Sequence, residues 1–393
     1  MTSGNSVMRR IGGASAVVLT AIAVPAAAAP RGAAAPRAAS ASPATGVPTW
    51  FRASAMTWTS STRGWVLGAR SCGLRHNCRP SDVIGTTNGG RTWHLVGTIA
   101  AVIPKLGLGT NGITEIRFAT STVGWAYAPR LFRTGDGGRT WKAMPIPGGG
   151  KQVLDLAVTP TAAYAIVSPC GYNAGLCSSK PLTAWRTGLT RTRSTRLSVR
   201  LRPNVAANIS AYGKTVYVVT PPIDGPHPSQ FYASTDGGRR FVARPVPCAA
   251  ITLHSLIQAV PYSATKVALL CDGNPGFSKA AKSVYLSANT GKTDTYAGMM
   301  GPYGIQAELA VSPSGNLVVA SWSDGSFIYI NDNHGTTWHM IIGSGDGGAG
   351  FNDPTYVSKR VVWVVGAPAS MFADYGRLLV SRDAGRHWAF AKL

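Results

Sequence analysis

Short runs of apolar and β-branched residues, separated by Gly, Ser, Thr and Pro, recur along the chain from about residue 50 onward. Residues 113–146 show the pattern well, because the runs ITEIRFAT, GWAYA, RLFRT and TWKAMPI follow one another within them. Runs of about four to eight residues that alternate or are continuously apolar are typical of β-strands. The pattern therefore predicts an all-β protein built from many short strands.

A glycine-rich box accompanies the strand pattern and repeats with it. Its clearest copy is TGDGGRTW at residues 134–141, and the others read TTNGGRTW, STDGGRRF, SANTGKTD, NDNHGTTW and SRDAGRHW. The gaps between the third residues of successive boxes are 48, 100, 53, 44 and 50 residues. The double gap predicts one eroded copy near Arg186, which makes seven units of about 49 residues. The third positions are Asn88, Asp136, Asp236, Asn289, Asn333 and Asp383.

The repeat extends beyond its box, since residues 56–65 align without a gap with residues 116–125. Four short strands per unit are the signature of a propeller blade. We therefore expect a seven-bladed β-propeller of four-stranded antiparallel blades over residues 48–393. In each box, the Asp or Asn oxygen can accept backbone N–H groups of a tight turn, and glycine permits positive φ. The Trp that follows can pack between neighbouring blades.

The boxes resemble the Asp-box, or bacterial neuraminidase repeat, S/T-x-D-x-G-x-T-W. Families that carry it include sialidases, xyloglucan-type glycosidases and the seven-bladed photosystem II assembly factor family. The resemblance implies a structural turn between the third and fourth strands of each blade, on the face away from the ligand site. It bears on fold much more than on chemistry.

The first residues have the layout of a secretory signal. Arg9 and Arg10 precede an apolar run, and small residues suitable for cleavage lie near Ala28. We expect a signal peptide over residues 1–29 and a disordered Ala/Pro-rich linker over residues 30–47. With no other membrane-spanning pattern, the mature protein is expected to be secreted, extracellular and monomeric.

Six cysteines suit an oxidising compartment, although six allow fifteen pairings in principle. Close spacing favours Cys72 with Cys78 and Cys170 with Cys177, which leaves Cys248 with Cys271. These positions fall between the second and third strands of a unit or between units. All three bridges are therefore expected on the face opposite the boxes.

That face also carries the longest and least repetitive loops, and binding residues often lie in loops on a rigid scaffold. The predicted ligand-facing side chains there, with plain solvation of the loops as the alternative, are Arg75, His76, Arg79, Tyr172, Asn173, His227, Trp322, Asp324, Asp353, Phe372 and Tyr375.

The formal net charge of +23, or +21 without the two signal arginines, is the other strong feature. Such a charge favours acidic cell-wall polymers, acidic glycans, anionic surfaces or an envelope protein as partners. The densest basic run lies in the eroded third unit, where solvation of an outer strand is the alternative to a functional role. It comprises Arg186, Arg191, Arg193, Arg196, Arg200 and Arg202, of which the last three share strand parity. No module for specific nucleic-acid binding is recognisable.

An enzyme is the second hypothesis. Glycoside hydrolysis usually needs two carboxyl groups that flank the bond, or a Tyr and Glu with three arginines in sialidases. The only glutamates, Glu115 and Glu308, are neighbours neither in sequence nor in repeat order. WFRAS at residues 50–54 resembles the start of sialidases without their Ile-Pro, and the resemblance implies that Arg52 binds a substrate carboxylate. A carboxylate pair could come from loops of the last two units, with ordinary turns as the alternative, through Asp324, Asp346, Asp353 and Asp374. The histidines and cysteines show no metal-ligand spacing, so no metal or cofactor is expected.

The sequence thus predicts a secreted binding or scaffold propeller of the cell envelope that engages an acidic polymer or a partner protein through its loop-rich face. An exo-acting, sialidase-like glycoside hydrolase is the alternative, and whether the protein is an enzyme stays open, with the scarcity of acids against it.

Overall fold

The computed structural model describes most of the chain from residue 46 to the C-terminus. The described ranges are 46–49, 51–70, 77–78, 81–104, 112–171, 180–191, 193–222, 229–250, 255–273, 279–323, 325–331, 335–344, 350–366 and 376–393. The expected signal peptide and nearly all of the expected linker lie outside these ranges.

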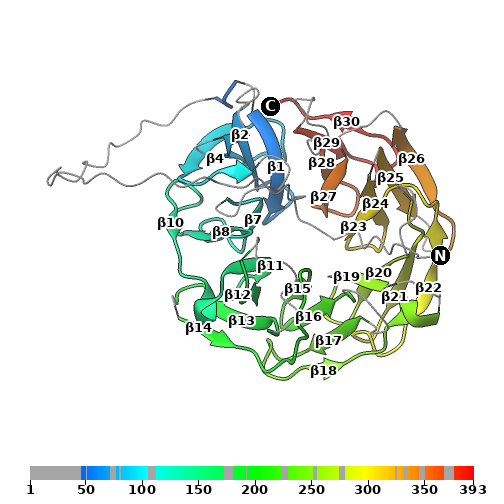
Figure 1. Ribbon diagram of the computed structural model, residues 1–393. Coiled ribbons are helices and arrows are strands. Elements are labelled where there is room, and N and C mark those ends of the chain that lie inside the picture. Colours follow the sequence, from blue (N-terminus) through cyan, green and yellow to red (C-terminus); the bar gives the residue numbers. More distant parts are fainter. Residues whose placement is uncertain are drawn as a thin grey trace, which may run out of the picture.

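Seven four-stranded antiparallel sheets stand around a common axis, as the strand pattern predicted (Figure 1). Each sheet consists of four successive strands of the ring, with the first innermost and the fourth at the rim. Blades 1 to 3 comprise β1 (Phe51–Trp58), β2 (Gly64–Arg70), β4 (Ser81–Thr86) and β5 (His94–Ile99); β7 (Glu115–Phe118), β8 (Gly124–Tyr127), β9 (Leu131–Thr134) and β10 (Lys142–Ala143); and β11 (Gln152–Thr159), β12 (Ala162–Ser168), β13 (Thr183–Gly188) and β14 (Ser194–Arg196).

Blades 4 to 7 repeat this arrangement. They comprise β15 (Asn208–Tyr212), β16 (Thr215–Thr220), β17 (Gln230–Ser234) and β18 (Val242–Ala243); β19 (Ser255–Pro261), β20 (Val267–Asp272), β21 (Lys282–Ser287) and β22 (Thr295–Met300); β23 (Gln306–Val311), β24 (Leu317–Trp322), β25 (Ser326–Asn331) and β26 (His339–Ser344); and β27 (Phe351–Tyr356), β28 (Val362–Gly366), β29 (Arg377–Ser381) and β30 (Ala389–Phe390). A small extra pair joins β3 (Asn77–Cys78) to β6 (Ile103–Pro104), and two short 3-10 turns, η2 (Pro147–Gly149) and η3 (Pro247–Ala250), lie between blades.

The hydrophobic core lies between the blades, because each sheet is covered on both faces. The second strands are accordingly buried along their whole length, as in β12 and β16. Aromatic side chains fill two of the junctions. Trp65 of blade 1 stacks on Phe118 of blade 2 with ring centroids 3.9 Å apart, while Trp58 and Trp93 of blade 1 surround Trp363 of blade 7. The first and last blades thus close the ring through side-chain packing.

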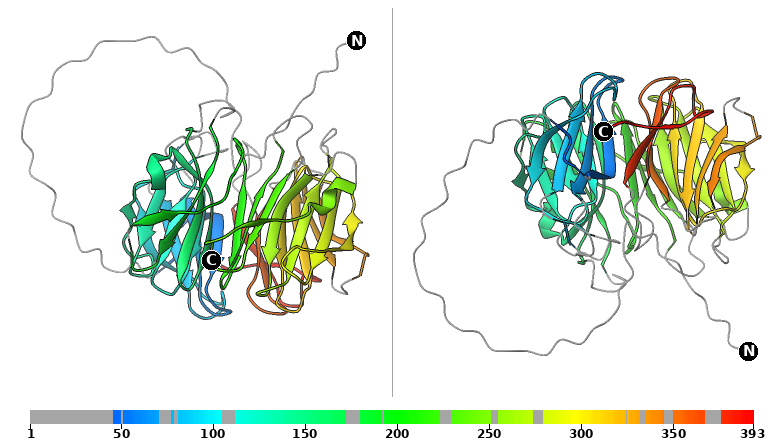
Figure 2. Two further views of the ribbon diagram at one scale, coloured as in Figure 1. Left: turned by 90° about the horizontal axis from the view of Figure 1, so that it is seen from below. Right: turned by 90° about the horizontal axis from the view of Figure 1, so that it is seen from above.

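The two faces of the ring differ in the connections that they carry, as the edge-on views show (Figure 2). Strands alternate in direction, so the first-to-second and third-to-fourth connections of every blade share one face, here called the turn face. The second-to-third connections and those between blades share the other, here called the loop face. The boxes of the described blades follow the third strand and therefore lie on the turn face.

The box turns are held by their own side chains. At residues 86–93, Asn88 Oδ1 accepts the backbone N–H groups of Arg91 and Thr92 at 3.1 and 3.0 Å, and Thr86 Oγ1 accepts that of Gly90 at 3.0 Å. Gly90 has a φ of +78°, which a side chain would disfavour. Asp136, Asp236, Asn289 and Asp383 make equivalent bonds in their turns, whereas Asn333 lies outside the described residues.

One of the three expected disulfides is fully visible. Cys248 in η3 is bonded to Cys271 at the end of β20, so the connection into blade 5 is fastened to that blade on the loop face. Cys170 is also disulfide-bonded. Its expected partner Cys177, together with Cys72 and the side chain of Cys78, lies outside the described residues, so the other two pairings stay predictions.

Candidate functional site

A ring of polar side chains surrounds the axis, here called the polar belt, and all of its members except Tyr127 of β8 come from the innermost strands. Each belt side chain bonds to the inner part of a neighbouring blade, mostly by accepting a backbone N–H group. Seven contacts join the seven blades: Thr57 Oγ1 to Phe118 N (3.1 Å), Tyr127 Oη to Asp155 Oδ1 (3.2 Å), Asp155 Oδ2 to Ile209 N (2.8 Å), Asn208 Oδ1 to Ala259 N (3.2 Å), Gln258 Oε1 to Leu309 N (2.7 Å), Glu308 Oε2 to Asp353 N (2.6 Å) and Asp353 Oδ2 to Met56 N (2.6 Å).

Irregularities in the inner strands help to aim these side chains. The register between the first and second strands shifts between Val153 and Asp155 in blade 3, and between Leu256 and Gln258 in blade 5. A similar shift follows Asn352 in blade 7. A β-bulge rotates the residues beside it relative to the regular pleat. The belt side chains at these bulges can therefore reach the neighbouring blade instead of their own.

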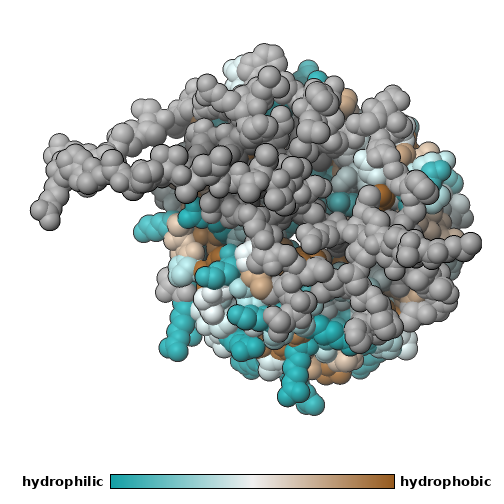
Figure 3. All heavy atoms as spheres, in the orientation of Figure 1, coloured by the Kyte–Doolittle hydropathy of each residue, from teal (hydrophilic) through white to brown (hydrophobic). Residues whose placement is uncertain are grey.

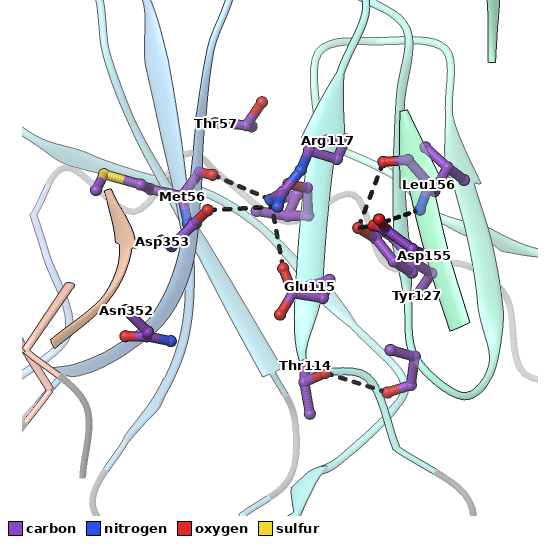
Figure 4. Close-up of polar contacts among 12 residues, drawn as sticks. Met56, Thr57, Thr114, Glu115, Arg117, Tyr127, Asp155, Leu156, Asn352 and Asp353 are labelled. Carbon is purple, nitrogen blue, oxygen red and sulfur yellow. Dashed lines mark hydrogen bonds and ion pairs between the residues drawn. The ribbon is translucent and has the colours of Figure 1, made fainter. Parts of the chain in front are cut away.

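Asp155 is the most heavily bonded member of the belt, and Figure 4 shows its contacts with Tyr127 and Leu156. Its Oδ1 accepts Leu156 N–H at 2.7 Å and the Tyr127 hydroxyl, and its Oδ2 accepts Ile209 N–H and the Asn208 side-chain amide at 3.0 Å. Burial raises the pKa of Asp155 above its ordinary value, although these bonds and the charge of Arg117 act in the opposite direction. One carboxyl group thus ties together blades 2, 3 and 4.

Arg117 lies between two acids where blades 1, 2 and 7 meet (Figure 4). Its guanidinium is 3.3 Å from Glu115 and 3.3 Å from Asp353, and it also donates to Ile116 O at 2.8 Å. The side chains of Glu115, Arg117 and Asp353 are 30%, 28% and 12% exposed. The cluster therefore combines two carboxyl groups that share one positive charge with partial access to water.

The pKa of Glu115 is raised well above its ordinary value, and burial is the largest cause. Arg117 lowers it, whereas the negative charges of Asp353, Glu308 and Asp155 raise it further. The 30% exposure of the side chain is modest, and it lies on an innermost strand near the ring axis, surrounded by the other blades. Burial is therefore the dominant cause of the raised pKa of Glu115.

This arrangement suits closure of the ring better than acid–base catalysis. A hydrolase needs carboxyl groups that are available to its substrate on both sides of the scissile bond. Both oxygens of Asp155 and of Asp353 accept bonds from protein groups, and Glu308 accepts a backbone N–H. Within the described residues, no group of three or more His, Cys, Asp or Glu side chains could hold a metal ion.

Of the predicted ligand-facing residues, the structure describes Arg52, Trp322 and Asp353. Arg52 lies on β1, and Trp322 ends β24 on the loop face. Asp353 was expected in a loop, and that placement is wrong, because it lies on the inner strand β27 and belongs to the belt. The remaining candidates lie outside the described residues: Arg75, His76, Arg79, Tyr172, Asn173, His227, Asp324, Asp346, Phe372, Asp374 and Tyr375.

Sequence reasoning missed most of the belt. Glu115 and Glu308 were treated as unrelated because they are distant in repeat order, yet the ring brings their charges close enough to interact. A signal for the belt does exist in the chain. The largely apolar first strand carries a polar residue near its start in units 3 to 6, in VLDLAV, ANISAY, LIQAVP and AELAV, namely Asp155, Asn208, Gln258 and Glu308. Its recurrence at one position of the repeat could have indicated a shared structural role.

Comparison with known proteins supports the fold. No protein-family model and no curated protein sequence matches the chain. The β-propeller domain of the Trilobed protease from Pyrococcus furiosus, which has an open velcro topology, matches with a TM-score of 0.52 and 9% identity over 87% of this chain and 98% of that one. YCF48 bound to D1 peptide matches with a TM-score of 0.46 and 18% identity over 71% and 80%. A GH74 enzyme from Niastella koreensis matches with a TM-score of 0.31 and 13% identity over 86% and 71%.

The seven four-stranded sheets define a seven-bladed β-propeller, and the likeness to the Pyrococcus furiosus propeller domain, at 9% identity, supports the fold alone.

Proposed function

We propose that this chain is a binding or scaffold propeller of the cell envelope, exported by its N-terminal signal, which engages an acidic polymer or a partner protein through its loop face. The observation that carries the proposal is the engagement of the inner carboxylates in bonds between blades. These inner acids serve the ring, so they are poorly placed to form a catalytic pair. A rigid disc with long connections on one face is a suitable platform for recognition.

Charge supports an anionic partner. The chain carries 38 Lys and Arg against 15 Asp and Glu. Hydrophilic side chains project from the rim near β14 and β18 in the view onto the loop face (Figure 3). Positive potential over such a surface attracts polyanions and speeds their association. Among the described residues, no helix is long and apolar enough to cross a membrane.

The first experiment measures binding. The purified mature protein is mixed with isolated cell wall, with poly(glycerol phosphate) and with an acidic polysaccharide over a series of salt concentrations. We expect binding that weakens steeply as salt rises, because exposed charges are screened within about 10 Å at 0.1 M salt. The absence of binding to every acidic polymer, together with salt-independent retention on the wall, would argue against an anionic ligand and for a partner recognised by other contacts.

A glycoside hydrolase remains the second candidate, and one observation favours it. Glu115 has a strongly raised pKa and lies beside Arg117 and Asp353, which is an environment in which a carboxyl group can retain a proton for general-acid catalysis. A panel of fluorogenic glycosides, including sialosides, separates the two functions. Turnover that disappears in the Glu115→Gln variant would replace the binding proposal with the hydrolase, whereas no turnover above that variant's background supports binding alone.

A further inference from the structure

Blade 3 has a hollow on its turn face, opposite the loop face. Pro160 and Thr161, from the connection between β11 and β12, form one side of it. The rest comes from the end of β13 and the turn that follows, namely Arg186, Gly188, Leu189, Thr190 and Arg191. Its volume is about 510 Å³, which lies within the range of about 300–1,000 Å³ that is usual for small-ligand sites.

This hollow occupies the place where the other blades carry their box. In the five described box turns, the third position is an Asp or Asn whose side chain bonds to the turn itself. Blade 3 has instead a short turn closed by Arg191 N–H to Gly188 O at 3.1 Å. The chain contains no Asp or Glu between Asp155 and Asp224. The eroded turn therefore leaves basic side chains without a local carboxylate.

Two guanidinium groups line the hollow. Arg186 lies on β13 opposite Tyr164, which packs in the core between blades 3 and 4. Its Nε is buried and has no hydrogen-bond partner within the described residues. Arg191 lies over Gly188, where an added Cβ would meet its Cγ and Cδ at 3.7 Å. The two side chains place two positive charges at the lining of the hollow, where they would attract an anion.

The floor of the hollow is fixed by the neighbouring blade. Arg133 of β9 donates from Nη2 to the carbonyl oxygen of Leu189 at 2.6 Å, and its guanidinium also lies 5.8 Å from the Trp125 ring centroid. Leu189 itself packs into the apolar cluster between blades 2 and 3. The turn that presents Arg191 is thus held in place before any ligand arrives, which reduces the entropic cost of binding.

We propose that this hollow, lined by Arg186, Arg191 and Thr190, is a binding site for the oxyanion of a phosphoester, either free or carried by a polymer. Two guanidinium groups together supply two positive charges and several N–H donors, and a threonine hydroxyl adds another donor. A phosphomonoester carries up to two negative charges and three terminal acceptor oxygens, whereas a carboxylate, like each phosphodiester of poly(glycerol phosphate), carries one charge and two terminal oxygens. The donors therefore match a phosphomonoester better than a carboxylate.

The site is distinct from the basic outer strand of the same blade. From Arg196 to Arg202 the exposed and buried residues alternate, with Leu197, Val199 and Leu201 buried and the arginines exposed. This segment runs along the rim toward the loop face, where Arg202 N–H is bonded to Gln230 Oε1. Arg196 and Arg200 therefore offer a matched control: the same blade, the same charge, and a position outside the hollow.

The test compares two double variants of the full mature protein, Arg186→Gln with Arg191→Gln in the hollow and Arg196→Gln with Arg200→Gln on the rim. Binding of poly(glycerol phosphate), glycerol 1-phosphate and polygalacturonate is measured at one fixed salt concentration. In parallel, the Arg Nε–H resonances of the unmodified protein are followed by NMR during titration with inorganic phosphate. Thermal melting of each variant reports whether it is folded.

We expect the hollow variant to bind poly(glycerol phosphate) at least about tenfold more weakly, as befits loss of charge-assisted bonds, and the rim variant to change by no more than about threefold. The Arg186 Nε–H resonance should shift and saturate with inorganic phosphate. Saturation with glycerol 1-phosphate as well would identify a single phosphoester as sufficient, whereas polymer-only binding would identify the polymer as the source.

Three results would overturn the proposal: equal losses in the two double variants, a non-saturating resonance, or tighter binding of polygalacturonate than of poly(glycerol phosphate). If the double variant in the hollow does not fold, Arg191→Gln alone decides, because Arg191 is exposed in a turn. Arg191→Gln must then weaken phosphate binding more than Arg200→Gln does. Equal losses of binding in these two single variants would refute the site.

Discussion

Replacing Asp155 by alanine tests whether the polar belt holds the ring together. The change removes four hydrogen bonds and leaves the N–H groups of Leu156 and Ile209, both residues only 3% exposed, without their acceptor. An unsatisfied buried donor costs about 1–3 kcal/mol, so the two cost about 2–6 kcal/mol. Relief of the burial that raises the pKa of Asp155 offsets part of this. We expect the free energy of unfolding to fall by about 3 kcal/mol.

Calorimetry of the variant measures this loss directly. An unfolding entropy of about 2.1 cal/mol/K per residue over roughly 340 residues corresponds to about 0.7 kcal/mol/K, so the midpoint should fall by about 4 °C. Asp155→Asn conserves volume but turns an NH₂ group toward existing donors, and we expect it to lose at least half as much. Asp294→Ala is the control, since that carboxylate makes no hydrogen bond within the described chain. The role of the belt would be refuted if Asp155→Asn were as stable as the wild type, or if Asp155→Ala and Asp294→Ala lost equal free energy of unfolding.

Three further predictions concern pH and the turns. Because the pKa of Glu115 is raised in the folded protein, its contribution to stability is complete below the unfolded-state pKa and is lost as pH rises through the folded-state pKa. Glu115→Gln should therefore flatten the fall in melting temperature with rising pH. An unchanged slope would contradict this. Burial lowers the pKa of Lys282 to about 8 in spite of the charge of Asp272. Stability should therefore increase as pH rises from about 8 to the ordinary lysine pKa of 10.5. Lys282→Met should lack that increase in the same series of melting measurements. Asp236→Ala should lower the free energy of unfolding, measured with urea, by about 1 kcal/mol because two backbone N–H groups lose their acceptor. Asp236→Asn should be near neutral, since Asn88 and Asn289 hold equivalent turns. Similar losses in the two variants would show that the charge, and not the acceptor, matters.

The seven-bladed architecture was predictable because its determinants are local. Strand length, the glycine-rich turn and the spacing between copies all recur within about 49 residues, and even the eroded turn after Arg186 occupies its expected place in blade 3. The bridge between Cys248 and Cys271 also followed from spacing and register. Its position on the loop face agrees with the predicted order of strands.

The polar belt was not predictable in the same way. Asp353 and Met56 are 297 positions apart, and no local pattern relates them. They meet only because the seventh blade returns to the first, and Glu115, Asp155 and Glu308 interact for the same reason. The hollow beside Arg186, by contrast, joins two turns of a single blade, but no spacing along the chain indicates that it forms.

The sequence alone therefore determined the number of blades, the order of their strands and the positions of their turns, because each unit repeats the same short-range instructions. Only the tertiary structure decided which charges neighbour one another. Closing a ring fixes distances between first strands that no spacing along the chain encodes, and it places carboxylates and arginines in environments that set their pKa values and their partners.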